Sequence, residues 1–223
     1  MAAKTRRRVP EKRDPEATRD ALLEAGHHLF AERGFDAVPI EEVAARAGVN
    51  KALISYHFGG KRALYVAVLE RGFATLAERL VEGERAAASA TEALEAVVAE
   101  FARFASEDPV FPAMYLREIL STGIESSVEP HILAVIGASQ RILARGVREG
   151  VFRQVNPLSF HFALVGGLMF FFATEPARRV IGPRIAPRMQ QPTVAEFTRH
   201  LVDLNLRGLA PAPAATRRKG VRS

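Results

Sequence analysis

Side chains that can hydrogen-bond to a nucleic acid are concentrated between residues 50 and 61, in the segment NKALISYHFGGK. Ile54 and Phe58 are four residues apart and would share one side of a helix, which leaves the neighbouring positions to project elsewhere. Ammonium, hydroxyl, amide and imidazole groups match the acceptors and donors of base edges and phosphates. The positions expected to lie against DNA are Asn50, Lys51, Ala52, Leu53, Ser55, Tyr56, His57 and Lys61.

A second helix must hold this segment in position, and the residues before it predict one. Apolar residues at positions 40, 43, 44 and 47 follow the i, i+3, i+4, i+7 spacing of one helical face. Gly48 then allows a left-handed helix end, and Asn50 can cap the next helix, which is expected to begin at Lys51. Two short helices joined by this turn predict a helix-turn-helix at about residues 39–58. An ordinary helical hairpin within a bundle is the alternative that the same pattern permits.

From Asp14 to about Phe73 the chain resembles the DNA-binding domain of the TetR family of bacterial transcription regulators. The resemblance rests on ALLEAGHHLFAERGF at 21–35, VAARAGV at 43–49 and YHFGGKRALY at 56–65. It implies that the second helix of the motif enters the major groove of DNA. Base edges are then expected to meet Lys51, Leu53 and Ser55, and phosphates are expected to meet Tyr56, His57, Lys61 and the amides at the start of the next helix.

Two features depart from the pattern of that family. Val38-Pro39 stands where its members commonly have the Thr or Ser that opens the first helix of the motif, and it supplies neither a hydroxyl nor a proline N–H. The recognition helix of the family often carries Gly, Thr and Tyr where this chain has Ala52, Leu53 and Ser55. This chain is therefore expected to dock on DNA as members of that family do, but its base preferences cannot be taken from theirs.

The net charge of +6 arises at the two ends of the chain. Residues 1–13 carry +5 and residues 211–223 carry +4, which leaves −3 for the residues between them. The high isoelectric point is therefore no evidence for the helix-turn-helix itself. The basic arm at 1–13 is expected to be flexible, and it either follows phosphates or the minor groove or stays solvated. The basic tail at 211–223 is expected to stay solvated.

The composition indicates a folded cytoplasmic protein. Its 223 residues, 48% of them hydrophobic, suffice for a substantial core, and the lack of cysteine excludes disulfides and thiolate metal sites. The first residues lack the apolar stretch of a secretory signal. The longest apolar run, residues 162–173, is shorter than the about 20 residues that span a bilayer, so no membrane partner is expected.

Helical periodicity and helix-end signals recur along the chain, and no segment alternates with the period of a strand. Asp14-Pro15 and Asn156-Pro157 are typical helix starts, and Gly34, Gly150 and Gly208 fall where helices should end. We therefore predict an all-α fold, with an N-terminal three-helix DNA-binding domain at 14–75 and a C-terminal helical effector-binding and dimerisation domain at 76–210. The helices are expected at 14–33, 40–47, 51–58, 61–82, 91–106, 112–121, 128–149, 157–174 and 193–207.

Large apolar residues of the second domain permit two interpretations. They either form a filled core or line an apolar cavity with one or two polar anchors, as ligand sites between bundle helices do. The resemblance implies the cavity, because regulators of that family bind a small effector that changes the spacing of their two DNA-reading heads. The expected effector is apolar or amphipathic, and its pocket would contain Phe101, Phe104, Phe111, Met114, His161 and Met169.

The segment 160–173 is apolar on nearly every side, which would leave a large exposed patch on a monomer. Gly166-Gly167 permits close approach of a second backbone, and another apolar stripe follows at 194–204. These features predict a four-helix interface in a two-fold homodimer, unless the segment is simply central to its own bundle. The interface would contain Phe160, Gly167, Leu168, Phe171, Phe197, Leu201 and Leu204.

Motifs of enzyme chemistry are missing from the sequence. It contains no HExxH, GxSxG, P-loop or GxGxxG, and its histidines lack ligand spacing, so no enzyme, metal or cofactor is expected. The predicted function is sequence-specific transcription regulation through a near-palindromic operator in double-stranded DNA. The resemblance implies a repressor that a small effector releases. The alternative is a helical small-molecule-binding protein or enzyme without DNA binding.

Overall fold

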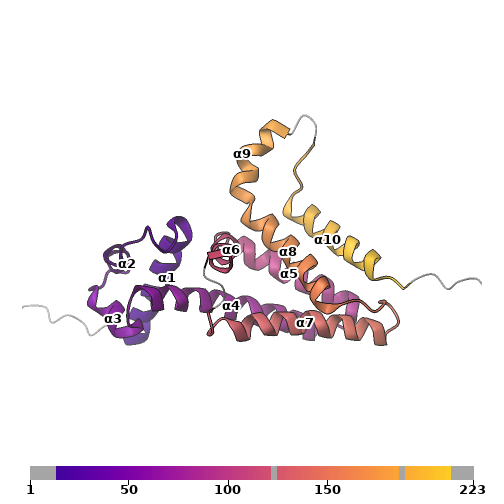
Figure 1. Ribbon diagram of the computed structural model, residues 1–223, viewed down its shortest axis with the longest axis horizontal. Coiled ribbons are helices and arrows are strands. Elements are labelled where there is room, and N and C mark those ends of the chain that lie inside the picture. Colours follow the sequence, from indigo (N-terminus) through magenta and orange to yellow (C-terminus); the bar gives the residue numbers. More distant parts are fainter. Residues whose placement is uncertain (1–13, 122–124, 186–188, 212–223) are drawn as a thin grey trace, which may run out of the picture. The chain divides into compact units, whose positions relative to one another are not determined.

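The structure of the chain, a computed structural model, describes residues 14–121, 125–185 and 189–211. These ranges contain ten helices and no strand, which confirms the all-α prediction (Figure 1). The predicted arm at 1–13 and the tail from residue 212 lie outside the described residues. The helices are α1 (Pro15–Arg33), α2 (Ile40–Arg46), α3 (Ala52–Phe58), α4 (Lys61–Ala86), α5 (Ala90–Glu107), α6 (Phe111–Ser121), α7 (Glu129–Arg148), α8 (Pro157–Ala173), α9 (Glu175–Ile185) and α10 (Val194–Leu209).

The chain divides into two compact units, residues 1–69 and residues 70–223. Both this division and the predicted one at residue 75 fall within α4. In the first unit α1 begins as predicted, because the Asp14 side chain accepts a hydrogen bond from the amide of Glu16 at 3.1 Å. The core of this unit fixes the helices that carry the polar segment. Its fully buried members include Leu22, Phe30, Val38, Val43, Ile54 and Leu64.

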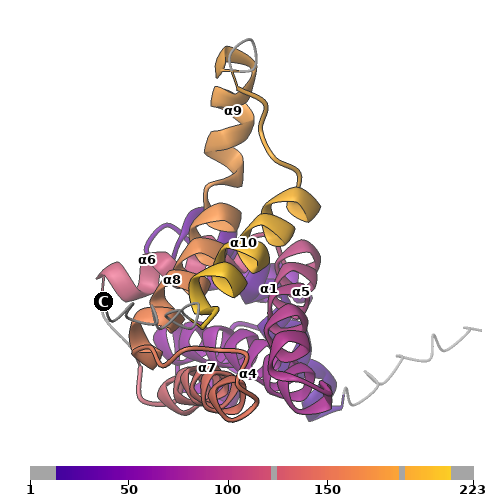
Figure 2. The same ribbon diagram turned by 90° about the vertical axis from the view of Figure 1, so that its right-hand side faces the viewer.

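In the second unit α8 packs against α5, α6, α7 and α10. Figure 2 shows α8 and α10 side by side. Aromatic rings fill the interior: Phe111 meets the rings of Phe73 and Phe104 edge-on, with 5.2 and 5.1 Å between centroids. An ion pair at 2.7 Å between Arg141 of α7 and Glu84 joins α7 to the last turns of α4. The second unit is thus a helical bundle built around α8.

Helix α9 extends away from the other helices of the second unit (Figures 1 and 2). The sequence pattern does not predict it, because Pro176, Gly182 and Pro183 are poor helix formers. A tertiary contact supports it: the guanidinium of Arg178 lies 3.9 Å from the ring centroid of Phe171 and donates to the Phe171 carbonyl oxygen at 2.8 Å. Among the described residues, no single helix is long and apolar enough to cross a bilayer. The pair α8–α9 passes that test of length and composition only when taken together, and it is bent by 74°.

Two further helix ends show how well local signals perform. The Asn156 side chain caps α8 as predicted by accepting from the amide of Ser159 at 3.0 Å. The prediction that Gly208 ends a helix was wrong, because α10 continues to Leu209. The Arg153 side chain donates to the Gly208 carbonyl oxygen at 2.7 Å, and its amide donates to that of Leu209 at 2.7 Å. These bonds satisfy carbonyl groups at the helix end, so no left-handed glycine is needed there.

Candidate nucleic-acid interface and ligand cavity

The turn between α2 and α3 is built from local signals. Gly48 adopts the left-handed conformation with φ of +66°, as predicted. The Asn50 side chain accepts a hydrogen bond from the amide of Ala52 at 2.9 Å, which confirms the predicted cap. The helix begins at Ala52 rather than at Lys51. Two helices joined by a tight turn are therefore present at 39–58.

One side of α3 is anchored in the core, and other positions face solvent. Ile54 is completely buried, whereas Tyr56 exposes 78% of its surface. A rigid anchor on one side allows the outward side chains to be presented in fixed directions, as groove recognition requires. The other expected DNA contacts divide into exposed residues (Asn50, Lys51, Ala52 and Ser55) and half-buried residues (Leu53, His57 and Lys61).

An acidic side chain lies beside the lysine expected to read a base. The Nζ atom of Lys51 is 3.3 Å from Oε1 of Glu41 in the first turn of α2, and both side chains are mostly exposed. A backbone hydrogen bond at Glu41 lowers the pKa of its carboxyl, and the bond from Lys51 lowers it further. The sequence does not indicate this pair, because a turn separates its members. A DNA contact of Lys51 would compete with this pair.

Replacing Glu41 with glutamine is expected to tighten DNA binding by about two- to fivefold, because an exposed ion pair is weak and its loss frees Lys51. The gain should be largest at low salt, where a carboxylate near phosphates is least screened. Fluorescence anisotropy with operator DNA at two salt concentrations measures it. Glu24→Gln on α1 removes the same charge and is the matched control. An equal gain in both variants would assign the effect to net charge alone.

The start of α4 offers a second set of groups for DNA. Gly59 and Gly60 lead into it with φ of +85° and +149°, conformations that favour glycine, and its first turn contains no acidic residue. The amides and positive dipole end of that turn suit a phosphate. The Nζ atom of Lys61 lies 4.4 Å from the ring centroid of Phe35. The ring holds this cation beside the start of the helix, where the expected phosphate contact would form.

A cavity lies within the second unit, between α4, α5, α6, α7 and α8, and is a candidate ligand site. Four of the six expected pocket residues line it: Phe101, Phe111, His161 and Met169. The other two residues lie outside the lining of this cavity. Phe104 and Met114 are packed in the core, with 5% and 0% of their surfaces exposed, and do not line the cavity. Helical periodicity identifies the inward side of a helix but does not separate a cavity wall from filled core.

The cavity is small in this structure, with a volume of about 40 Å³. Sites that enclose a drug-sized ligand measure about 300–1,000 Å³, so this cavity must widen to hold one. Helix α4 supplies part of its wall through Phe73, Leu76 and Leu80, which the sequence analysis does not assign to the pocket, and α6 adds Tyr115. Burial raises the pKa of Tyr115 to about 12, which keeps its hydroxyl protonated near neutral pH.

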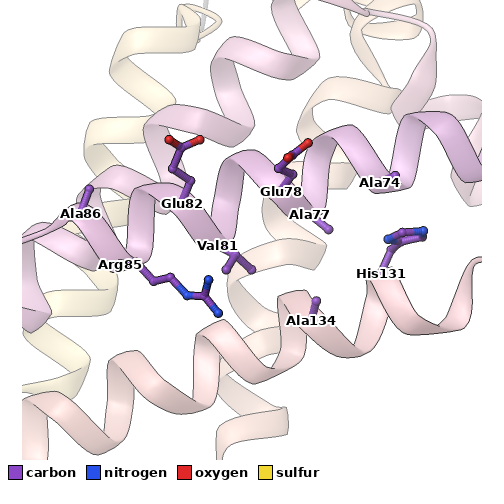
Figure 3. A pocket seen from close by; sticks show the side chains of 9 residues that line it. All are labelled: Ala74, Ala77, Glu78, Val81, Glu82, Arg85, Ala86, His131 and Ala134. Atoms are coloured by element: carbon purple, nitrogen blue, oxygen red, sulfur yellow. The ribbon is translucent and has the colours of Figure 1, made fainter.

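A larger hollow of about 820 Å³ runs between α4 and α7 and is open to solvent (Figure 3). Short apolar side chains such as Ala77, Val81 and Ala134 line it. Figure 3 shows Arg85 and His131 pointing toward the space between the two helices. Glu78, Glu82, Arg85 and His131 line it as well, and a groove this open to solvent covers little of a ligand's surface. The smaller cavity is therefore the better candidate for an enclosed effector.

Most of the residues expected at a dimer interface are covered within one chain. Phe160, Leu168, Phe171 and Leu201 are buried, Gly167 and Phe197 are half-buried, and Leu204 is 57% exposed. Leu168 and Phe171, one of which was expected to face a partner, are covered within this chain, and Phe171 stacks on Phe197 at 3.9 Å between centroids. The large exposed residues in the apolar stretch of α8 are instead Phe162 and Phe170, at 69% and 67%. A helix that is apolar all round carries no periodic signal for its outward side.

Two family models match this chain. Residues 22–68 match the model described as "Bacterial regulatory proteins, tetR family". Residues 91–204 match the model described as "Tetracyclin repressor-like, C-terminal domain". The first match contains the helix-turn-helix, and the second spans about half of the chain and contains α8.

Known proteins similar to this chain include a repressor and an activator of transcription. The transcriptional repressor NicS of Pseudomonas putida is 25% identical over 210 residues, which are 92% of this chain and 98% of NicS. The transcriptional activator FasR of Mycolicibacterium smegmatis is 36% identical over 90 residues, which are 40% of this chain and 41% of FasR. The solved structure of FadR from Bacillus subtilis in complex with stearoyl-CoA has a TM-score of 0.71 at 16% identity, over 85% of this chain and 98% of that one. It has the same fold.

Proposed function

Because the chain belongs to the TetR family of bacterial transcription regulators, we propose that it is a repressor whose homodimer binds a near-palindromic operator and leaves it when an effector binds. Members of this family bind DNA operators, dimerise and bind small-molecule effectors. We propose repression rather than activation because the repressor NicS matches 92% of this chain, whereas the activator FasR matches 40% of it. The proposed place of action is the cytoplasm, where bacterial DNA lies.

The asymmetry of α3 is the observation that carries the proposal. Ile54 holds the helix in the core of the first unit, while Lys51, Ser55 and Tyr56 face solvent. In the DNA complex Lys51 and Ser55 would meet base edges in the major groove. Tyr56 and His57 would hold phosphates together with the amides at the start of α4, which sets the register of the helix without reading sequence.

The proposed dimer forms through exposed apolar residues of α8 and α10. Phe162 and Phe170 lie on α8, and a Cβ added at Gly166 between them would meet no atom within 4 Å, so a second backbone has room to approach. Leu204 of α10 and Val180 of α9 are exposed as well. These exposed apolar residues are the kind that the apolar centre of a dimer interface covers. A two-fold dimer would place its recognition helices about 34–36 Å apart, and a near-palindromic operator follows.

The effector is proposed to act from the cavity of the second unit. Helix α4 contributes Phe73, Leu76 and Leu80 to the cavity wall, and the same helix carries Lys61 at its start. A ligand that widens the cavity must displace this wall, and a displaced α4 would change the spacing of the two DNA-reading heads. FadR in complex with stearoyl-CoA is a protein of this fold that holds a molecule with a long apolar chain.

DNA from upstream of the chain's own gene tests the proposal. In a gel shift with excess non-specific competitor, the full-length protein should form a discrete complex with a Kd of about 10⁻⁸ M or lower. Random DNA of the same length and base composition is the matched control. Equal affinity for both DNAs would contradict sequence-specific regulation.

A further inference from the structure

A histidine in the cavity has one ring nitrogen without a hydrogen bond to any residue that the structure describes. His161 of α8 lines the cavity and is 6% exposed. Its Nδ1 atom lies 3.0 Å from Oγ of Ser139 on α7, whereas its Nε2 atom makes no hydrogen bond to any described residue. Desolvation lowers the pKa of the imidazole, so the ring is neutral near neutral pH. The cavity therefore contains a neutral ring with one unsatisfied nitrogen.

We infer the position of the proton on that ring from the neighbours of Ser139. The Ser139 hydroxyl lies 3.4 Å from the carbonyl oxygen of Val135, one turn earlier on the same helix, and helical serines commonly donate to that carbonyl. With its hydrogen directed there, the Ser139 oxygen accepts from Nδ1–H of His161. The Nε2 atom is then unprotonated, so it presents an acceptor to the cavity. A ligand must bring a hydrogen-bond donor to satisfy it.

The remaining wall of the cavity favours an uncharged ligand. Its aromatic members include Phe73, Phe101, Phe111 and Tyr115, and no described residue that lines it carries a charge when His161 is neutral. A carboxylate or ammonium group would lose its hydration there without meeting an opposite charge. Apolar groups fit most of this wall, which is aromatic and aliphatic apart from the Tyr115 hydroxyl and the His161 ring nitrogens.

We propose that the effector is a compact, uncharged molecule whose apolar body carries a hydroxyl group, and that this hydroxyl donates a hydrogen bond to Nε2 of His161. The assignment rests on the proposed function, because it names the ligand of the same effector site. A phenol or an alcohol meets the requirement. An ether of the same shape has no donor and leaves Nε2 without this hydrogen bond. A site that bonds a ligand hydroxyl discriminates against the analogue that lacks it.

Isothermal titration calorimetry on the full-length protein without DNA tests this inference. The probes are 4-ethylphenol, 4-ethylanisole and 4-ethylbenzoate, which share a body and differ in the polar group. At neutral pH 4-ethylphenol is expected to bind about tenfold or more tightly than 4-ethylanisole, and at least as much more tightly than 4-ethylbenzoate. Equal affinities for the phenol and the ether would overturn the proposal, as would failure of all three probes to bind at millimolar concentrations.

Variants locate the preference at the ring nitrogen. His161→Phe keeps a flat ring of similar size and should lower the ratio of phenol to ether affinity to about one. Ser139→Ala removes the partner that holds the proton on Nδ1 and should lower the same ratio several-fold, which provides a second test if the first variant does not fold. His28→Phe, on α1 of the other unit, is the control and should leave the ratio unchanged. An unchanged ratio in His161→Phe would remove the histidine from ligand recognition.

A second measurement, made with operator DNA, separates this inference from the proposed function. Operator binding is followed by fluorescence anisotropy during titration with 4-ethylphenol. Loss of the operator complex supports both proposals. Binding of 4-ethylphenol with the expected dependence on His161, but without any effect on the operator complex, would contradict effector-driven release and support the ligand assignment to this site.

Discussion

Phe170→Asp should turn the operator-binding dimer into a folded monomer and weaken operator binding by about 10²–10⁴-fold, because the second half-site no longer contributes. Phe170 is 67% exposed, so the substitution leaves the core of its own bundle intact. In the proposed dimer the new carboxylate would lie in the apolar centre of the interface without a partner, which is strongly unfavourable. Phe162→Asp, on the same helix with 69% exposure, should act in the same way.

Sedimentation velocity measures the oligomeric state of these variants, and anisotropy measures their operator affinity. Leu133→Asp on α7 changes a leucine that is 56% exposed and is the control for a surface charge outside α8. Leu168→Asp should instead unfold the chain, because Leu168 is fully buried. If the Phe170→Asp protein remains dimeric, this side of α8 is not the dimer interface. A monomeric unmodified protein that still binds the operator at micromolar concentration would remove both the dimer and the palindrome.

Lys51→Ala should weaken binding to the specific operator by about 1–3 kcal/mol and relax the preference at one base pair, because a side chain that reads a base edge carries that much discrimination. Tyr56→Phe and Lys61→Ala should weaken binding to operator and random DNA alike, since phosphates have no base identity. Without DNA, Lys51 pairs with Glu41 at 3.3 Å. The contact with the base replaces this pair, so the loss of affinity in Lys51→Ala measures the difference between the two contacts.

The measurement is a set of Kd values for the operator, for operators mutated at single positions and for random DNA. Lys61→Arg is the companion of Lys61→Ala, because an arginine can keep the contact with the Phe35 ring and a positive charge. Melting temperatures of all variants separate lost contacts from lost folding. If Lys51→Ala and Tyr56→Phe lower affinity equally on every DNA, Lys51 does not read a base.

Local sequence signals were sufficient for the helix-turn-helix. The apolar spacing at 40–47, the left-handed Gly48 and the cap at Asn50 each act over a few residues, and the structure contains all three. The all-α fold could be predicted and the family recognised for the same reason, because both depend on patterns within short segments. The boundaries were less certain, as Gly208 within α10 shows, because bonds from Arg153 satisfy the end of that helix.

By contrast, the cavity and the outward side of α8 depended on packing between helices. Phe104 and Phe111 have the same side chain and both are buried, but only Phe111 reaches the cavity. Leu168 and Phe170 are two residues apart in a helix that is apolar all round, yet one is fully buried and the other is 67% exposed. No pattern of polar and apolar residues distinguishes such positions.

The sequence by itself determined where most helices form, which segment carries the helix-turn-helix and which family of regulators the chain belongs to. Tertiary structure alone decided that Lys51 meets Glu41, that Phe170 rather than Leu168 faces outward on α8 and that His161 meets Ser139 of α7. The physical reason lies in the range of the forces concerned. Helix periodicity and capping arise from hydrogen bonds between residues a few positions apart. The neighbours of a side chain across a helix pair depend instead on crossing angles and close packing, which involve residues far apart in the sequence.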